Sequence, residues 1–86
     1  MLIEYLCRMN LLKIGHRGAK GHLAENTLES IQKALDFGVD AIEIDAHRCK
    51  TGELVIIHDF TLDRTTNGSG EIAKKSLAEL QALKIE

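Results

Sequence analysis

Phenylalanine, tyrosine and tryptophan are nearly absent from the sequence, and no stretch carries charge of only one sign. Tyr5, Phe37 and Phe60 are the only such aromatic residues among 86, and the formal net charge is −2 at pH 7. A protein that binds nucleic acid typically shows a basic patch, or rings on which bases stack. The sequence shows neither feature, so we expect no nucleic-acid partner.

Cysteines are few, and long apolar runs are missing. Cys7 and Cys49 form no C-x-x-C pattern, which favours two thiols over a disulfide or a metal site. No apolar run is long enough to predict a membrane-spanning helix. The apolar residues of 1–10 are interrupted by Glu4 and Arg8, and they are too few for a signal peptide. We therefore expect no membrane span and, by default, a cytoplasmic location.

The overall composition is typical of one small globular unit. The chain is 44% hydrophobic and 28% charged, which fits a soluble domain. A chain of this size buries only about 60–65% of its unfolded surface, so we expect modest stability. We divide it into an N-terminal extension, residues 1–10, and a domain, residues 11–86. The extension has the apolar spacing of a short amphipathic helix, but an upstream strand or a lid is equally compatible.

Apolar runs and turn residues predict strands alternating with helices. The predicted strands are 11–16, 41–46 and 54–58, the predicted helices are 27–37 and about 77–83, and 61–70 is predicted as a polar loop. This order predicts an α/β fold with a mostly parallel sheet.

Capping residues mark the ends of the two predicted helices. Asn26 and Glu29 have the spacing of a capping box at the first helix, and Gly38 suits the position just after its end. Leu28, Ile31 and Leu35 recur at helical spacing within it. Ser76 to Glu79 is a second capping box, which begins the second helix.

The segment between the second and third predicted strands leaves two geometries open. Only residues 47–53 separate the strands, whereas parallel neighbours usually need a connection of a dozen residues or more. Either this segment runs extended back along the sheet, or residues 50–53 close an antiparallel hairpin. A symmetric hairpin about that turn would place Asp45 opposite His58, and both geometries predict that these two residues are neighbours.

Two carboxylates stand out in the second predicted strand. Glu43 and Asp45 are two residues apart, so they project from one face, while Ile42 and Ile44 occupy the opposite face, which we expect to be buried. Paired carboxylate oxygens suit a hard divalent cation, Mg²⁺ or Ca²⁺. The alternative is a solvated polar face of a half-buried strand.

Two histidines and an arginine lie at the ends of predicted strands. His16 and His58 each follow an apolar run, and histidine can pass protons near neutral pH, so the pair could act as general base and general acid. Arg17 offers a planar fork of donors that suits a phosphate oxygen. Taken singly, each of the three could instead be an ordinary polar residue at a strand end or on the surface.

Three further residues have weaker claims on the candidate site. Asp59 could hold His58 in place, and His47 could be a supporting group or a third metal ligand. Arg64 lies in the predicted polar loop and could either contact substrate or fix the loop. We expect the five main residues, spread over some forty positions, to converge on one divalent ion and its phosphate.

In their order and spacing, several motifs closely resemble the start of the glycerophosphodiester phosphodiesterases. The likeness runs from about Leu12 to Leu83. The motifs are Ile14-Gly-His-Arg-Gly-Ala-Lys-Gly21, Glu25-Asn-Thr27, Ala41-Ile-Glu-Ile-Asp45 and Ile57-His-Asp-Phe-Thr-Leu-Asp-Arg-Thr-Thr-Asn-Gly-Ser-Gly70. The resemblance implies a (β/α)₈ barrel, related to phosphatidylinositol-specific phospholipase C. It also implies hydrolysis of glycerophosphodiesters to glycerol-3-phosphate and an alcohol, with a divalent metal.

Roles for five residues follow from the resemblance. His16 and His58 match the family's acid–base pair, Glu43 and Asp45 match two metal ligands, and Arg17 matches its phosphate-binding arginine. A glycerol hydroxyl would then attack phosphorus, and water would open the resulting cyclic phosphate. A barrel of this kind needs about 250 residues, so the chain would supply about three strands and two helices.

Two alternatives to this enzyme stay open. The chain could be a truncated, catalytically incomplete fragment that acts as a structural module or self-associates through open sheet edges. It could also come from a related phospholipase with the same catalytic residues.

Overall fold

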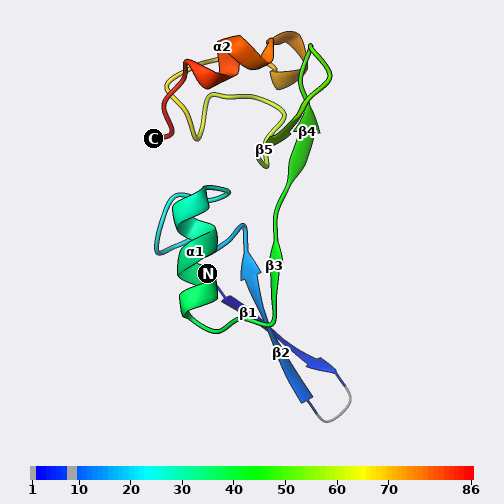
Figure 1. The fold of residues 1–86 in the computed structure, drawn as a ribbon, viewed down its shortest axis with the longest axis vertical. Helices are drawn as coiled ribbons and strands as arrows, with labels where there is room; N and C mark the ends of the chain where they lie inside the picture. The colour runs from blue at the N-terminus through cyan, green and yellow to red at the C-terminus, as the bar shows by residue number, and fades with distance from the viewer. Residues whose placement is uncertain (1, 8–9) are drawn as a thin grey trace. The chain divides into compact units, whose positions relative to one another are not determined.

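The computed structural model describes residues 2–7 and 10–86, and the side chains of residues 12–86. The chain forms two compact units, residues 1–45 and 46–86 (Figure 1). The first unit holds a three-stranded sheet and a helix. The second holds a two-stranded sheet, one turn of 3₁₀-helix and a short α-helix.

The sheet of the first unit runs in the order β1-β2-β3. β1 (Leu2–Cys7) pairs antiparallel with β2 (Asn10–His16), and β3 (Ala41–Glu43) pairs parallel with the other edge of β2. Of the three possibilities for the N-terminal extension, the structure therefore has the strand. The β2–β3 pair is parallel, as the α/β pattern predicted, but the expectation of mostly parallel pairing is wrong for the described strands, since the β1–β2 pair and the strand pair of the second unit are antiparallel.

Helix α1 (Leu28–Asp36) begins one residue later than its capping pattern suggested. Thr27, not Asn26, is the N-cap, and its hydroxyl accepts a hydrogen bond from the Ser30 amide. The prediction placed the cap wrongly because Asn26 has a left-handed backbone, with φ of 55°. Gly38 follows the helix with φ of 76°, as predicted from the low cost of that conformation for glycine.

The buried face of α1 consists of small residues, not of the predicted apolar stripe. Ser30 and Ala34 are fully buried, whereas Leu28 is 82% exposed and Leu35 is also exposed. The Ser30 hydroxyl accepts a hydrogen bond from the Ala19 amide at 2.7 Å and donates one to the Arg17 carbonyl at 3.2 Å. This hydroxyl therefore ties α1 to the loop that follows β2.

Two glycines allow this close approach. A Cβ on Gly15 would lie 3.0 Å from the Ala34 Cβ, and one on Gly18 would lie 2.6 Å from the Ser30 Oγ. Gly18 also has φ of 83°. Helix and loop backbones can approach to this degree only because neither position carries a side chain.

The predicted second strand, residues 41–46, is not continuous. It is divided into β3 in the first unit and β4 (Ala46–Arg48) in the second. Ile42 is half-buried, but Ile44 is 46% exposed, so the expectation of a buried face formed by both isoleucines is wrong at Ile44. The strand ends at Glu43, where its pairing with β2 ends too.

β4 forms a hairpin with β5 (Leu54–Ile56). The pairing is antiparallel, with Ala46 opposite Ile56 and Arg48 opposite Leu54. The hairpin geometry is thus the one present, but its register is shifted by one residue from the symmetric turn over residues 50–53. Gly52, with φ of 95°, supplies the left-handed residue that a three-residue hairpin loop requires.

The segment 61–70 is more deeply packed than a polar loop was expected to be. Leu62 and Thr66 are buried, and the Thr66 hydroxyl donates a hydrogen bond to the Leu62 carbonyl at 2.7 Å. The Asp63 carboxylate accepts a hydrogen bond from the Gly70 amide at 3.0 Å. A 3₁₀ turn, η1 (Ile72–Lys74), follows.

Helix α2 (Leu77–Gln81) closes the second unit. The capping box of Ser76 and Glu79 is formed in both directions, as predicted. The helix is shorter than expected, since Ala82 is already its C-cap. Leu77, Leu80 and Leu83 pack with Val55 against a core that comprises Cys49, Ile57, Leu62 and Ile72.

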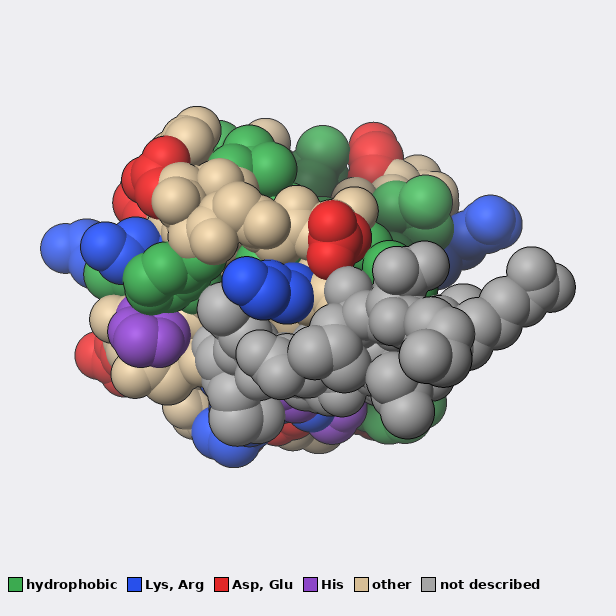
Figure 2. Space-filling view, turned by 90° about the horizontal axis from the view of Figure 1, so that it is seen from below, with side chains coloured by type: hydrophobic (Ala, Val, Ile, Leu, Met, Phe, Trp, Pro, Cys, Tyr) green, Lys and Arg blue, Asp and Glu red, His purple; other side chains and the backbone are tan. Residues whose placement is uncertain are grey.

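The surface carries mixed charge. On the face shown in Figure 2, basic and acidic side chains lie interspersed with hydrophobic ones. Within residues 2–7 and 10–86, no helix is long and apolar enough to cross a membrane. Cys49 is a buried free thiol, as predicted, while the side chain of Cys7 lies outside the described residues.

We predict that Gly18→Ala destabilises the chain far more than Gly38→Ala. Both glycines have positive φ, which costs a residue with a Cβ about 1–2 kcal/mol. A Cβ at Gly38 has no atom within 4 Å, whereas one at Gly18 would overlap Ser30 and the Ile31 amide. Overpacking adds about 1–3 kcal/mol to the backbone strain at Gly18. Urea unfolding measures the difference, and equal losses in the two variants would show that the helix does not approach the loop this closely.

Candidate functional site

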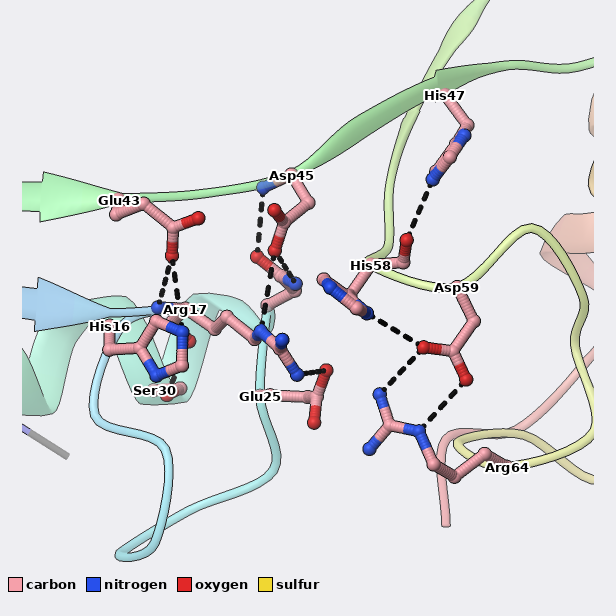
Figure 3. A network of polar contacts seen from close by, with 11 residues as sticks. His16, Arg17, Glu25, Ser30, Glu43, Asp45, His47, His58, Asp59 and Arg64 are labelled. Carbon is pink, nitrogen blue, oxygen red and sulfur yellow. Dashed lines mark hydrogen bonds and ion pairs between the residues drawn. The ribbon is translucent and has the colours of Figure 1, made fainter.

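The first group of site residues lies where β2 and β3 end side by side. His16 is paired with Glu43 in the parallel register. The Arg17 amide donates a hydrogen bond to Glu43 Oε1 at 3.0 Å, and the same oxygen lies 4.0 Å from His16 Nε2 (Figure 3). Three of the five predicted residues are therefore neighbours within the first unit.

Arg17 holds an unusual backbone conformation and a nearly buried side chain. Its φ is 54°, and its side chain is only 13% exposed. Nη1 donates a hydrogen bond to Glu25 Oε2 at 3.1 Å, and Nε lies 3.6 Å from Asp45 Oδ2. Two carboxylates thus fix the guanidinium, as the close-up in Figure 3 shows.

Asn26 holds Asp45 at two points. Its Nδ2 donates a hydrogen bond to Asp45 Oδ2 at 3.1 Å, and its Oδ1 accepts one from the Asp45 amide at 3.4 Å. The left-handed backbone of Asn26 places the side chain where this is possible. The break after β3 therefore coincides with a residue whose backbone and carboxylate are both bound by one amide.

Two buried nitrogens of this group have no hydrogen-bond partner. They are His16 Nδ1 and Arg17 Nε. Buried polar atoms are nearly always paired, so an unpaired one indicates that a water or a ligand supplies the missing bond. Both nitrogens belong to residues that the sequence analysis assigned to the site.

The carboxylates fit part of a cation site. Glu43 and Asp45 offer hard oxygen donors, the type that Mg²⁺ and Ca²⁺ prefer. Within the part of the chain that the structure describes, no group of three or more His, Cys, Asp or Glu residues could hold a metal ion. Glu43 and Asp45 could therefore supply at most part of a ligand shell, and their binding of a metal stays a prediction.

The second group of site residues follows β5. His58 Nδ1 lies 2.8 Å from Asp59 Oδ1, and the Arg64 guanidinium binds both oxygens of Asp59, through Nε at 2.8 Å and Nη2 at 3.0 Å. His47 Nε2 donates a hydrogen bond to the His58 carbonyl at 2.8 Å. The suggestion that Asp59 holds His58 is thus confirmed, and His47 is a supporting group on the His58 backbone.

The Asp59 carboxyl is stabilised in its ionised form. The hydrogen bonds from Arg64, and after them the one from His58, hold the pKa of Asp59 well below its usual range. An ionised carboxylate can only accept hydrogen bonds. The proton between Asp59 and His58 therefore lies on Nδ1 of the imidazole.

Sequence reasoning gave three of the supporting residues no role in the site. Glu25 appeared only within the motif that carried the resemblance, Asn26 was assigned as a helix cap, and Ser30 did not appear at all. For Asn26, the available signal is that Thr27 can also cap the helix, which leaves the Asn26 side chain for another contact. Nothing in the sequence marks Ser30, since a hydroxyl in a helix is ordinarily an exposed or capping group.

Comparison with known proteins finds a consistent set of relatives. Residues 16–86 match the model of the glycerophosphoryl diester phosphodiesterase family. The chain is 44% identical over 75 residues to a glycerophosphodiester phosphodiesterase of Caldanaerobacter subterraneus, covering 87% of this chain and 31% of the relative. It is 41% identical over 73 residues to one of Bacillus subtilis, covering 85% of this chain and 25% of that relative.

Solved structures give the same result. A glycerophosphodiester phosphodiesterase of Agrobacterium tumefaciens superposes with a TM-score of 0.79 at 43% identity, over 81% of this chain and 31% of that one. A phosphodiesterase of Oleispira antarctica, in complex with the product sn-glycerol-3-phosphate, superposes with a TM-score of 0.79 at 47% identity. That match covers 81% of this chain and 28% of that one. The fold is thus the beginning of a (β/α)₈ barrel, and the chain spans about a quarter to a third of its relatives' length.

We predict that Asp59→Asn removes a pH-dependent part of the stability of the second unit. Because the pKa of Asp59 is lowered on folding, its stabilisation is present above the unfolded value, about 3.9, and is lost as the pH falls through the folded value. The wild-type chain should therefore be more stable than Asp59→Asn at neutral pH, and the gap should narrow at about pH 3. Urea unfolding at the two pH values measures it, and a gap of constant size would contradict the ion pair.

Proposed function

The chain belongs to the glycerophosphoryl diester phosphodiesterase family, and we propose that it forms the N-terminal part of an enzyme that hydrolyses glycerophosphodiesters to glycerol-3-phosphate and an alcohol. The observation that carries the proposal is the group of His16, Arg17, Glu43 and Asp45 at adjoining strand ends. The name and product of the relatives support the same substrate class.

Arg17 is proposed to bind the phosphate. A guanidinium is a strong donor to phosphate oxygens, and it is most effective where its position is fixed beforehand. Glu25 and Asp45 fix it here, with little exposure of either Arg17 or Glu25. Nε lies 3.6 Å from Asp45 but has no hydrogen-bond partner, so it could donate a hydrogen bond to a ligand oxygen.

Glu43 and Asp45 are proposed to hold a divalent cation, Mg²⁺ or Ca²⁺, which would neutralise charge on the phosphate. Asn26 would hold the Asp45 carboxylate in place for this task, since ligands of a metal are commonly oriented by outer hydrogen bonds. The Arg17 amide would do the same for Glu43.

His16 and His58 are proposed to move the protons. A hydroxyl of the glycerol attacks phosphorus, and one histidine takes its proton while the other gives a proton to the oxygen of the leaving alcohol. Water then opens the cyclic phosphate with the two roles exchanged, so the histidines return to their starting states. That His16 of one unit and His58 of the other serve the same phosphodiester stays a prediction.

We expect glycerophosphocholine to be hydrolysed by a form of the chain extended downstream, with Mg²⁺ or Ca²⁺ present and with loss on chelation. His58→Ala and His16→Ala should each lower kcat/KM by about 10²–10⁴-fold, the usual contribution of a general acid or base. His22→Ala is the matched control, because its ring packs on Phe37 outside the site. An extended form that is inert, or one unaffected by His58→Ala, would overturn the assignment.

A second candidate function rests on the exposed apolar side chains. Leu28 and Phe60 are 82% and 78% exposed, one in each unit. Exposed apolar side chains favour association, so the second proposal is a fragment that acts as a self-associating module.

For this alternative, we predict concentration-dependent sedimentation that Leu28→Ser reduces. Removing the apolar side chain takes away the surface that association would bury, while the helix caps at Thr27 and Gly38 are unchanged. Gln32→Ser, on the same helix, serves as the control. A chain that sediments as a monomer at all concentrations would exclude the module.

A further inference from the structure

The environment of His58 contains more than an acid–base group needs. Three side chains restrain this residue. Asp59 binds its ring, Arg64 binds Asp59, and His47 binds its backbone carbonyl. None of these contacts touches the ring nitrogen Nε2. These contacts therefore restrain Nδ1 and the backbone carbonyl of His58, but not Nε2.

We propose that Arg64 is a positioning residue, which acts through Asp59 to hold His58 as the Nδ1–H tautomer and so leaves Nε2 as its reactive nitrogen. The role of His58 in proton transfer rests on the function proposed above, but the tautomer does not. Neither Asp59 nor Arg64 needs to touch the substrate.

The geometry of the Asp59–Arg64 contact supports this role. The guanidinium binds the carboxylate with two parallel hydrogen bonds, at 2.8 and 3.0 Å, which fixes the plane of the carboxylate as well as its position. Oδ1 then accepts both from Arg64 Nη2 and from His58 Nδ1. Rotation of the carboxylate, which would release the imidazole, requires both bonds to Arg64 to break.

The chemistry of the pair determines where the proton lies. Because Asp59 is ionised, it has no proton to give, and a neutral imidazole can bind it only as the Nδ1 donor. The second nitrogen then carries a lone pair, which is the state that a general base needs. Without the acceptor, nothing within the described contacts keeps the proton on Nδ1.

The turn over residues 62–66 is built to present Arg64. Leu62 is buried in the core, and Thr66 closes the turn through its amide and hydroxyl, both of which donate to the Leu62 carbonyl. Asp63, which directly precedes Arg64, accepts a hydrogen bond from the Gly70 amide. The backbone on either side of Arg64 is therefore held by hydrogen bonds within the unit.

His47 restrains the residue at a second point. Its Nε2 donates to the His58 carbonyl at 2.8 Å, and its ring makes an edge contact with Phe60 at 4.7 Å between centroids. Because His47 lies in β4, the hairpin fixes the backbone of His58 while Asp59 fixes its ring. The two restraints act on different atoms and can be removed separately.

Nitrogen-correlated NMR of ¹⁵N-histidine-labelled chain tests the proposal, because it distinguishes the two neutral tautomers. We expect wild-type His58 to be mainly the Nδ1–H form. Asp59→Ala should make the other tautomer the majority, and Arg64→Gln should shift the population in the same direction to a smaller extent. Arg64→Lys, which keeps the charge but not the fork, should fall between Arg64→Gln and the wild type.

Two matched controls accompany these variants. Glu71→Gln changes an exposed carboxylate of the same unit, which pairs with Lys74, and Arg48→Gln removes an equal charge from β4. Both should leave the tautomer unchanged. A wild-type His58 that is mainly the Nε2–H form, or a tautomer unmoved by both Asp59→Ala and Arg64→Gln, would overturn the proposal.

Kinetics of the extended form separate this inference from the proposed function. Arg64→Gln should lower kcat on the order of ten- to a hundredfold, the usual effect of removing an outer hydrogen-bond partner, with KM nearly unchanged. If the tautomer of His58 changes without any loss of kcat, the contacts from Arg64 through Asp59 to His58 have no role in catalysis. If the extended form is inert but the tautomer still shifts in the variants, the proposed function is rejected and the positioning role of Arg64 stands.

Discussion

The hydroxyl of Ser30 determines how the first unit is assembled. It lies between the Arg17 carbonyl and the Ala19 amide and is fully buried in a helix face that has no larger polar group. Removing it would leave a buried amide unsatisfied, which costs about 1–3 kcal/mol. Because the loop is attached at this point, Arg17 can hold a strained backbone while its side chain stays between two carboxylates.

The second unit also holds its candidate site residues in fixed positions, but with different contacts. The imidazole of His58 is not placed by a helix but by hydrogen bonds within the unit, since Arg64 holds Asp59 and Asp59 holds the ring. The packed turn over residues 62–66 takes the place of the helix as the rigid support. Both units thus place their functional side chains on backbone that is held by hydrogen bonds to buried or capped groups, which is what preorganisation requires.

Local signals in the sequence predicted much of this. Gly38 and the capping box at Ser76 are where the sequence indicates them, because caps depend on contacts within four residues. The pairing of His16 with Glu43 also follows, since parallel strands end at one edge of the sheet. The family resemblance assigned roles that spacing alone left open.

Other features depend on distant parts of the chain and could not be derived. Asn26 is an excellent capping residue that is used elsewhere, because Asp45, nineteen residues on, binds both ends of its amide. The break after Glu43 lies beside this contact, and periodicity in the sequence does not mark it. The apolar spacing of Leu28 and Leu35 shows that they share a side of α1, but periodicity does not show whether another element covers that side.

The left-handed backbones of Arg17 and Asn26 have a consequence for engineering. Glycine adopts such φ values without strain, but at Arg17 it would remove the contacts to Glu25 and Asp45, and at Asn26 the two hydrogen bonds to Asp45. Selection for heat resistance should therefore keep both side chains, because removing one partner of a nearly buried ion pair costs more than the backbone strain that glycine would relieve. Sequence design for this fold should fix these two identities before any other residue is varied.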